Sequence, residues 1–363
     1  MGKCTEEEKK VYNAVCTILE EIDIDGVNPT DPLASGVLDL TKLGDTYMNL
    51  LPADVVELLT VSNFLKEVDL PPAAQKMLDE FEETYKHLGT DFSLSDMDGI
   101  GYPAGIKDRQ LKRNMGMMWS VLEGFRNIWT CTPRLDETNY SENALVVEAV
   151  SRILKPIFGY CSMPLEQVWG EHISESSKHR TGAAASPNKP DLCIRVDFQG
   201  ADVELAFCEF ASLGMGHPKH RDDWRKSVRA CKDGSDMLRD ICFEGKKTDC
   251  NEAIILIRSL NNIPSIAILN KKTNLTFSVI DTFNGKFFKA YKILDIDIPL
   301  RPVDRQVVED FLKKALQVKT FVEEVACEVI KVLEKSISLP VDDNEDIATR
   351  LENLTIASTT FSS

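Results

Sequence analysis

Helical spacing of apolar residues dominates the first 140 positions of the chain. Thr5 and Glu8 have the spacing of a capping box, and an apolar run with helical period follows them. Further runs of this kind follow, one of them directly after two prolines. The pattern predicts a helix that begins after Thr5 and further helices over 53–68, 71–88 and 107–128.

From Ser141 onward, helical runs alternate with strand-like runs. Ser141 can cap a helix with one apolar face, and the polar segment 174–189 is interpreted as a flexible loop. Turn-forming residues at 199–202 and 283–285 separate pairs of strand-like runs. The predicted strands cover 165–169, 190–198, 203–211, 253–260, 265–270, 275–281 and 286–294, and the predicted helices cover 222–243 and 303–336. This order predicts an α/β core.

Composition narrows the class of protein. With 43% hydrophobic and 28% charged residues, the chain is globular. It has no apolar run of the roughly 18 residues that a membrane span needs, and its N-terminus lacks the apolar stretch of a signal peptide. The ten cysteines are scattered without a Cys-x-x-Cys pair, which favours reduced thiols. We therefore expect an intracellular protein, nuclear or cytoplasmic, with no membrane partner.

The net charge of −16 is unevenly distributed. Residues 1–140 hold 13 Lys and Arg against 25 Asp and Glu, whereas residues 141–300 hold 21 of each. The middle of the chain is therefore the part that can tolerate a polyanion. Charge and pattern together predict four parts: an acidic α-helical N-terminal region over 1–140, an α/β core over 141–300, a C-terminal helix packed on that core over 301–339, and a disordered tail over 340–363.

Two acidic residues fall on the neighbouring strands of one predicted hairpin. Pro190-Asp191 opens the first strand, and Glu209 lies near the end of the second. Because antiparallel pairing brings the start of one strand beside the end of the next, we expect the two carboxylates to be neighbours. Carboxylates are ligands that Mg²⁺ prefers, and Mg²⁺ ions promote phosphodiester hydrolysis by activating water and neutralising the phosphate. The pair therefore predicts a site for Mg²⁺ or Mn²⁺.

A helix with a glutamate, Pro-Asp on a strand, a glutamate on the hairpin partner and a basic helix follow in that order over 141–300. This order resembles the PD-(D/E)XK nuclease-like superfamily and, more narrowly, a group of uncharacterised fungal proteins with a degenerate form of its core. The resemblance implies a central mixed sheet flanked by helices, to which the N-terminal helical region and the C-terminal helix are additions. It implies that Asp191 and Glu209 hold the metal and that Glu142, or Glu148 as second choice, is the helix carboxylate.

The motif of this superfamily has a lysine two residues after the hairpin glutamate, and this chain has Ala211 there. In some members the catalytic lysine has moved to another element. Here the helix after the hairpin offers Lys232 as first choice and Lys226 as second choice for an ammonium group that orients the attacking water. Loss of catalysis is the alternative, because both lysines could equally be solvated surface residues.

Two functions follow from the resemblance and stay open. The first is a Mg²⁺-dependent phosphodiesterase that acts on DNA or RNA through the 141–300 core, with a migrated lysine. The second is a catalytically inactive nuclease-like fold used for nucleic-acid binding or for protein interaction, with the acidic N-terminal helices as the partner surface. The sequence does not decide whether the protein is an enzyme.

One basic and aromatic cluster lies on the predicted helix after the hairpin. Over 219–247 there are nine Lys and Arg against six Asp and Glu. The cluster comprises Trp224, Arg225, Lys226 and Arg229, with Lys219 and Arg221 nearby. A solvated helix face is the simpler interpretation of this excess, and contact with a phosphate backbone is the alternative.

Overall fold

The computed structural model describes residues 5–22, 27, 31–41, 49–60, 64–85, 101–102, 104–131, 135, 141–170, 172–182, 187–211, 217–244, 246, 250–285 and 287–339. The predicted tail over 340–363 lies outside these ranges.

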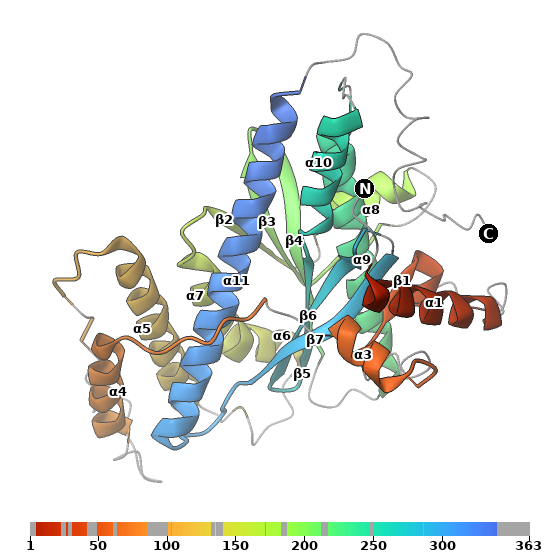
Figure 1. Cartoon of the computed structure of the whole chain (residues 1–363). Coiled ribbons are helices and arrows are strands. Elements are labelled where there is room, and N and C mark those ends of the chain that lie inside the picture. Colours follow the sequence, from red (N-terminus) through yellow and green to blue (C-terminus); the bar gives the residue numbers. More distant parts are fainter. Residues whose placement is uncertain are drawn as a thin grey trace.

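A seven-stranded mixed sheet forms the centre of the molecule, in the order β1-β7-β6-β5-β4-β3-β2 (Figure 1). The strands are β1 (Val37–Asp39), β2 (Leu165–Trp169), β3 (Leu192–Phe198), β4 (Ala201–Glu209), β5 (Ser265–Lys271), β6 (Asn274–Phe283) and β7 (Phe287–Asp297). Neighbouring strands are antiparallel, except that β4 is parallel to β5 and β1 is parallel to β7. The predicted α/β class is confirmed.

Helices surround this sheet. They are α1 (Glu6–Glu21), α3 (Ala53–Thr60), α4 (Pro72–Tyr85), α5 (Arg109–Trp129), α6 (Glu142–Leu145), α7 (Ser151–Gly159), α8 (Glu175–Thr181), α9 (His217–Phe243), α10 (Cys250–Asn261) and α11 (Arg305–Ile337), with a 3₁₀ turn η2 (Pro32–Ser35) and a π-helical turn η5 (Val146–Val150). The capping box of Thr5 and Glu8 is present at the start of α1. The predicted helix over 53–68 is shorter than expected, because residues 64–68 are not helical. Within the described residues, no helix has the length and apolar character needed to cross a bilayer.

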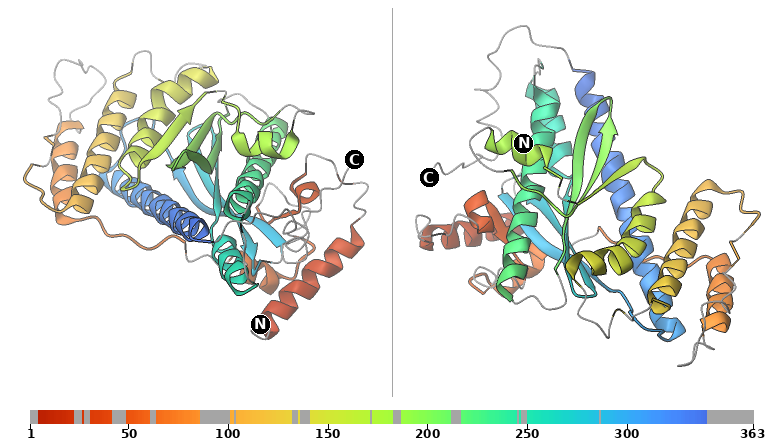
Figure 2. Two further views of the ribbon diagram at one scale, coloured as in Figure 1. Left: turned by 90° about the horizontal axis from the view of Figure 1, so that it is seen from above. Right: turned by 180° about the vertical axis from the view of Figure 1, so that it is seen from behind.

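Helices cover both faces of the sheet, and alternate residues of a strand pack on different faces. In β3, Ile194 belongs to the core that contains α5, α7 and α11, whereas Cys193 packs with Trp224 and Val228 of α9. Figure 2 shows α9 and α11 on opposite sides of the sheet. Burial on both faces explains why β5 is an almost continuous apolar run.

The β3–β4 hairpin is confirmed, with a shorter turn than predicted. Gln199 and Gly200 alone form it, with φ values of 54° and 87°, and Ala201 already belongs to β4. Two successive residues with positive φ match the right-handed twist of the strands on either side. The tight turn sets the register that pairs Leu192 with Cys208.

The apolar run over 253–260 is part of helix α10, so the strand predicted there is wrong. Ala253, Leu256 and Leu260 are buried, whereas Ile255 is 48% exposed, as helical spacing requires. Short apolar runs fit a buried strand and a helix about equally well by sequence alone. Here the tertiary structure favours the helix, because α10 lies beside α11 and buries one apolar face against it.

The segment 174–189, predicted to be a loop, contains helix α8. Ser174 is its N-cap and accepts a hydrogen bond from the backbone N–H of Ser177. The buried carboxylate of Glu204 on β4 accepts hydrogen bonds from the backbone N–H groups of Glu175 and Ser176, both at 3.1 Å. A carboxylate distant in sequence thus accepts hydrogen bonds from backbone N–H groups in the first turn of this short helix. The local sequence does not predict that contact.

Strand β1 comes from the N-terminal region over 1–140, for which only helices were predicted. It pairs in parallel with β7 at the sheet edge. Asp39 at its end is 1% exposed and accepts a hydrogen bond from Trp224 Nε1 of α9 at 2.7 Å. The N-terminal region therefore contributes an edge strand to the sheet.

Candidate metal and catalytic site

Asp191 and Glu209 lie at the open end of the β3–β4 hairpin. The Asp191 backbone N–H donates to the carbonyl oxygen of Cys208 at 3.0 Å, which continues the ladder one residue beyond β3. The Phe210 backbone N–H donates to Asp191 Oδ2 at 2.7 Å. Glu209 is the last residue of β4 and is only 5% exposed. The hairpin thus brings the two predicted metal ligands together, because its register pairs the start of one strand with the end of the other.

The two carboxylates perturb each other electrostatically. Burial, followed by the negative charge of Asp191, raises the pKa of Glu209 to about 8. Burial also raises the pKa of Asp191, and its hydrogen bond from Phe210 opposes that change. Glu209 Oε1 is buried and accepts no hydrogen bond from the described residues. A cation placed between these groups would relieve both their repulsion and the missing contact.

Glu142, the predicted helix carboxylate, joins this group from the N-terminus of α6. Ser141 caps that helix by accepting a hydrogen bond from the backbone N–H of Ala144 at 3.3 Å. Lys219 Nζ of α9 lies 2.7 Å from Glu142 Oε2, and the charge of Glu142 raises the pKa of Asp191. The helix carboxylate is therefore electrostatically coupled to the hairpin pair.

Glu148, the second choice for that role, has a different environment. Its side chain forms an ion pair with Arg152 at 2.7 Å, one helical turn further along the chain. The carbonyl oxygen of Glu148 accepts a second hydrogen bond from the same guanidinium group. Of the two glutamates, the structure brings Glu142 to the site.

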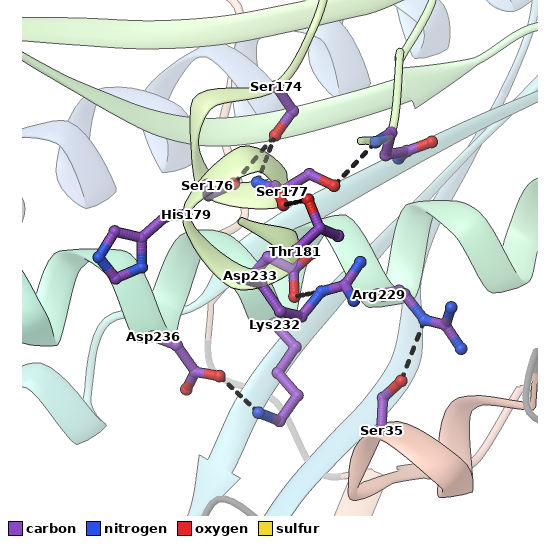
Figure 3. A network of polar contacts seen from close by, with 12 residues as sticks. Ser35, Ser174, Ser176, Ser177, His179, Thr181, Arg229, Lys232, Asp233 and Asp236 are labelled. Carbon is purple, nitrogen blue, oxygen red and sulfur yellow. Dashed lines mark hydrogen bonds and ion pairs between the residues drawn. The ribbon is translucent and has the colours of Figure 1, made fainter. Parts of the chain in front are cut away.

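The two predicted lysines also have different environments. Lys226 lies near the hairpin end: its charge lowers the pKa of Glu209, and its Nζ lies 3.2 Å from Asp223 Oδ1. Lys232 instead pairs with Asp236, one turn along α9 (Figure 3). Its Nζ lies 5.4 Å from the ring centroid of Phe288. Lys226, the second choice from sequence, is thus the lysine that the structure places with the carboxylates.

Two members of the site were not predicted. Lys219 and Asp223 lie on the same face of α9 as Lys226, at a helical spacing of four and three residues. Asp223 is 1% exposed, and its Oδ2 accepts no hydrogen bond from the described residues. The sequence alone shows that these three residues share one helix face. Which face of the helix meets the hairpin is not visible without the fold.

Together these residues form the carboxylate–lysine site: Glu142, Asp191, Glu209 and Asp223 with Lys219 and Lys226. In the described part of the chain, no group of three or more His, Cys, Asp or Glu side chains is arranged to hold a metal ion. Mg²⁺ is commonly bound by one or two protein carboxylates, with water and phosphate as the other ligands. Asp191 and Glu209, with the buried free oxygen of Glu209, fit that donor set.

Ala211, two residues after Glu209, is 2% exposed. Its methyl group is buried directly after β4, beside Phe210, whose ring lies 6.0 Å from that of Trp169. The ammonium groups of the site, those of Lys219 and Lys226, come from α9, which packs against β4.

The chain matches no protein-family model, and no curated protein or solved structure shows significant similarity to it.

Proposed function

We propose that this protein is a divalent-metal-dependent phosphodiesterase of PD-(D/E)XK type that acts on nucleic acid, with its catalytic lysine on α9. The observation that supports this most is the position of Lys226. Its charge acts on the buried Glu209 and on Asp191. Lys226 thus supplies, beside the buried Glu209 and the half-buried Asp191, the ammonium group that Ala211 cannot supply from the strand.

Asp191 and Glu209 would hold Mg²⁺ or Mn²⁺, which when bound supplies an activated water and neutralises charge on the phosphate. Lys226 Nζ has hydrogen-bond donors to orient that water or a phosphate oxygen. Asp223, at 3.2 Å, keeps the ammonium group charged and in place. Glu142 acts at longer range and is itself held by Lys219.

Strand cleavage is the direct test. Purified protein is incubated with labelled single-stranded and double-stranded DNA and RNA, with Mg²⁺, Mn²⁺ or EDTA. We expect cleavage that requires the metal and is lost in Asp191→Asn, a change that keeps the size and the acceptor for Phe210 but removes the charge. Cleavage by Asp191→Asn at the parent rate would overturn the proposal.

Calorimetric titration with Mn²⁺ separates this function from an inactive nuclease-like fold. The active site predicts one Mn²⁺ bound in the parent protein and weaker binding in Asp191→Asn. If the parent protein binds no Mn²⁺ and cleaves no substrate, the core serves binding or protein interaction instead.

A further inference from the structure

A pocket of about 560 Å³ lies beside the carboxylate–lysine site. Five cationic side chains line it, Arg180, Lys189, Arg225, Lys226 and Arg229, against the single carboxylate of Asp222. Lys226 belongs both to this basic pocket and to the carboxylate–lysine site, so the two adjoin. The size is within the range of pockets that take a small ligand or one unit of a polymer.

The cations converge from three segments of the chain. Arg180 comes from α8, Lys189 from the segment just before β3, and the other three from two successive turns of α9. Arg180 Nε lies 2.6 Å from the buried Asp233 on α9, and Arg229 Nε lies 3.2 Å from Ser35 Oγ (Figure 3). These contacts hold the two guanidinium groups in defined positions, so that little side-chain entropy is lost when an anion binds.

The wall that carries Arg180 is itself anchored to the sheet. Glu204 of β4, 4% exposed, accepts hydrogen bonds from both the Ser174 hydroxyl, at 2.8 Å, and the first backbone N–H groups of α8. Ser177 Oγ accepts from the backbone N–H of Asn188 at 2.8 Å, which ties α8 to the segment of Lys189 (Figure 3). Buried polar contacts therefore hold the wall of the pocket that carries Arg180.

Arg180 and Arg229 repel each other in this pocket, although Arg180 also pairs with Asp233. Burial, and next the positive charge of Arg180, lower the pKa of Arg229 below its usual value. A group that brings negative charge between the two guanidinium groups would relieve this repulsion. Phosphate is the anion that best fits them, since guanidinium groups bind its oxygens through paired hydrogen bonds.

We propose that the basic pocket binds a phosphate of the nucleic-acid backbone adjacent to the one at the carboxylate–lysine site. This inference rests on the proposed function for the identity of the polymer. Backbone contacts of this kind fix the register of the strand without reading its sequence. Lys226 then stands between the two phosphates, and binding in the pocket requires no metal.

Fluorescence anisotropy with labelled DNA and RNA oligonucleotides, in EDTA, tests this without catalysis. We expect Arg229→Gln to weaken binding by about tenfold, the effect of losing a charge-assisted contact, and to reduce the slope of log affinity against log salt by about one. Arg258→Gln is the matched control: Arg258 is an exposed arginine on α10 that does not line the pocket, so the same charge is lost elsewhere and binding should change less than twofold.

Lys189→Gln guards against a folding defect, because Lys189 is an exposed residue of the pocket lining. It should also weaken binding and reduce the salt slope. Parent-like affinity and slope in both Arg229→Gln and Lys189→Gln would overturn the inference, whether or not the protein cleaves nucleic acid.

A competition arm with inorganic tripolyphosphate distinguishes a free polyphosphate from a nucleic-acid backbone. The backbone assignment would be contradicted if the parent protein preferred tripolyphosphate, so that a small excess of tripolyphosphate abolished binding of the labelled oligonucleotide. If Arg229→Gln binds more weakly but the parent protein cleaves no substrate, the basic pocket still binds nucleic acid and the proposed function is wrong.

Discussion

The backbone N–H of Phe210 donates a hydrogen bond to Asp191 Oδ2 across 2.7 Å, so the residue that follows Glu209 holds the neighbouring carboxylate in place. Together with the hydrogen bond from the Asp191 backbone N–H to Cys208, this contact holds the Asp191 side chain at the end of the hairpin where Glu209 lies. Their repulsion is the main reason, after burial, for the high pKa of Glu209.

Metal-free stability should therefore decrease with pH. Glu209 has a pKa of about 8 in the folded state and ~4.3 when unfolded. Between these values only the unfolded chain loses the proton, so the free energy of unfolding falls as pH rises through this window, by up to about 3–5 kcal/mol. Urea denaturation in EDTA at about pH 5 and about pH 9 measures this change.

Glu209→Gln is the control for that pH dependence, because it keeps the size of the side chain and cannot ionise. Its stability should fall by several kcal/mol less than that of the parent over the same pH range. An equal fall in both proteins would show that Glu209 does not hold its proton in the folded state.

Lys226 and Lys232 should differ in their effect on cleavage. Lys226→Met removes the ammonium group beside Glu209 and should lower kcat by about 10²–10³-fold, the usual effect of losing one donor that stabilises the transition state. Lys232→Met loses an ion pair with Asp236 outside the carboxylate–lysine site and should keep at least half of the activity. Cleavage is measured under single-turnover conditions. If Lys232→Met loses more activity than Lys226→Met, Lys232 is the catalytic lysine.

Trp224→Phe should destabilise the protein by about 2–3 kcal/mol, because Asp39 would lose a hydrogen bond from a buried donor at 2.7 Å. Both side chains are 1% exposed, so water cannot replace that contact. Trp169→Phe at the sheet edge is the matched control and should cost less than about 1 kcal/mol. Chemical denaturation compares the free energies of unfolding of the two variants. If both lose the same stability, the Asp39 contact does not hold β1 to α9.

Gly124 lets α5 approach α7 closely. A Cβ added there would lie 2.9 Å from the carbonyl oxygen of Arg152, so Gly124→Ala should cost about 1–3 kcal/mol despite its better helix propensity. At Gly159 the nearest atom to such a Cβ is Gln167 Nε2 at 3.6 Å, an ordinary contact. Gly159→Ala should therefore be neutral or slightly stabilising. Thermal unfolding of both variants tests whether the helix contact is as close as described.

Elements with strong local signals were predicted well. The capping box of Thr5 and Glu8 begins α1, the Leu165–Trp169 strand has the predicted bounds, and the long periodic run over 303–336 forms α11. Elements held by distant partners were missed. Helix α8 depends on Glu204 of β4, and β1 depends on the edge of β7 and on Trp224.

The sequence by itself determined the hairpin that carries Asp191 and Glu209, because strand alternation and a tight turn at Gln199-Gly200 are local properties. It also determined that Ala211 cannot supply an ammonium group. Only the tertiary structure decided between Lys226 and Lys232, since that choice depends on which residues of α9 lie beside Asp191 and Glu209. Packing of Trp224 and Val228 against the sheet sets the orientation of α9, and it brings Lys226 to the carboxylates while Lys232 lies beside Phe288.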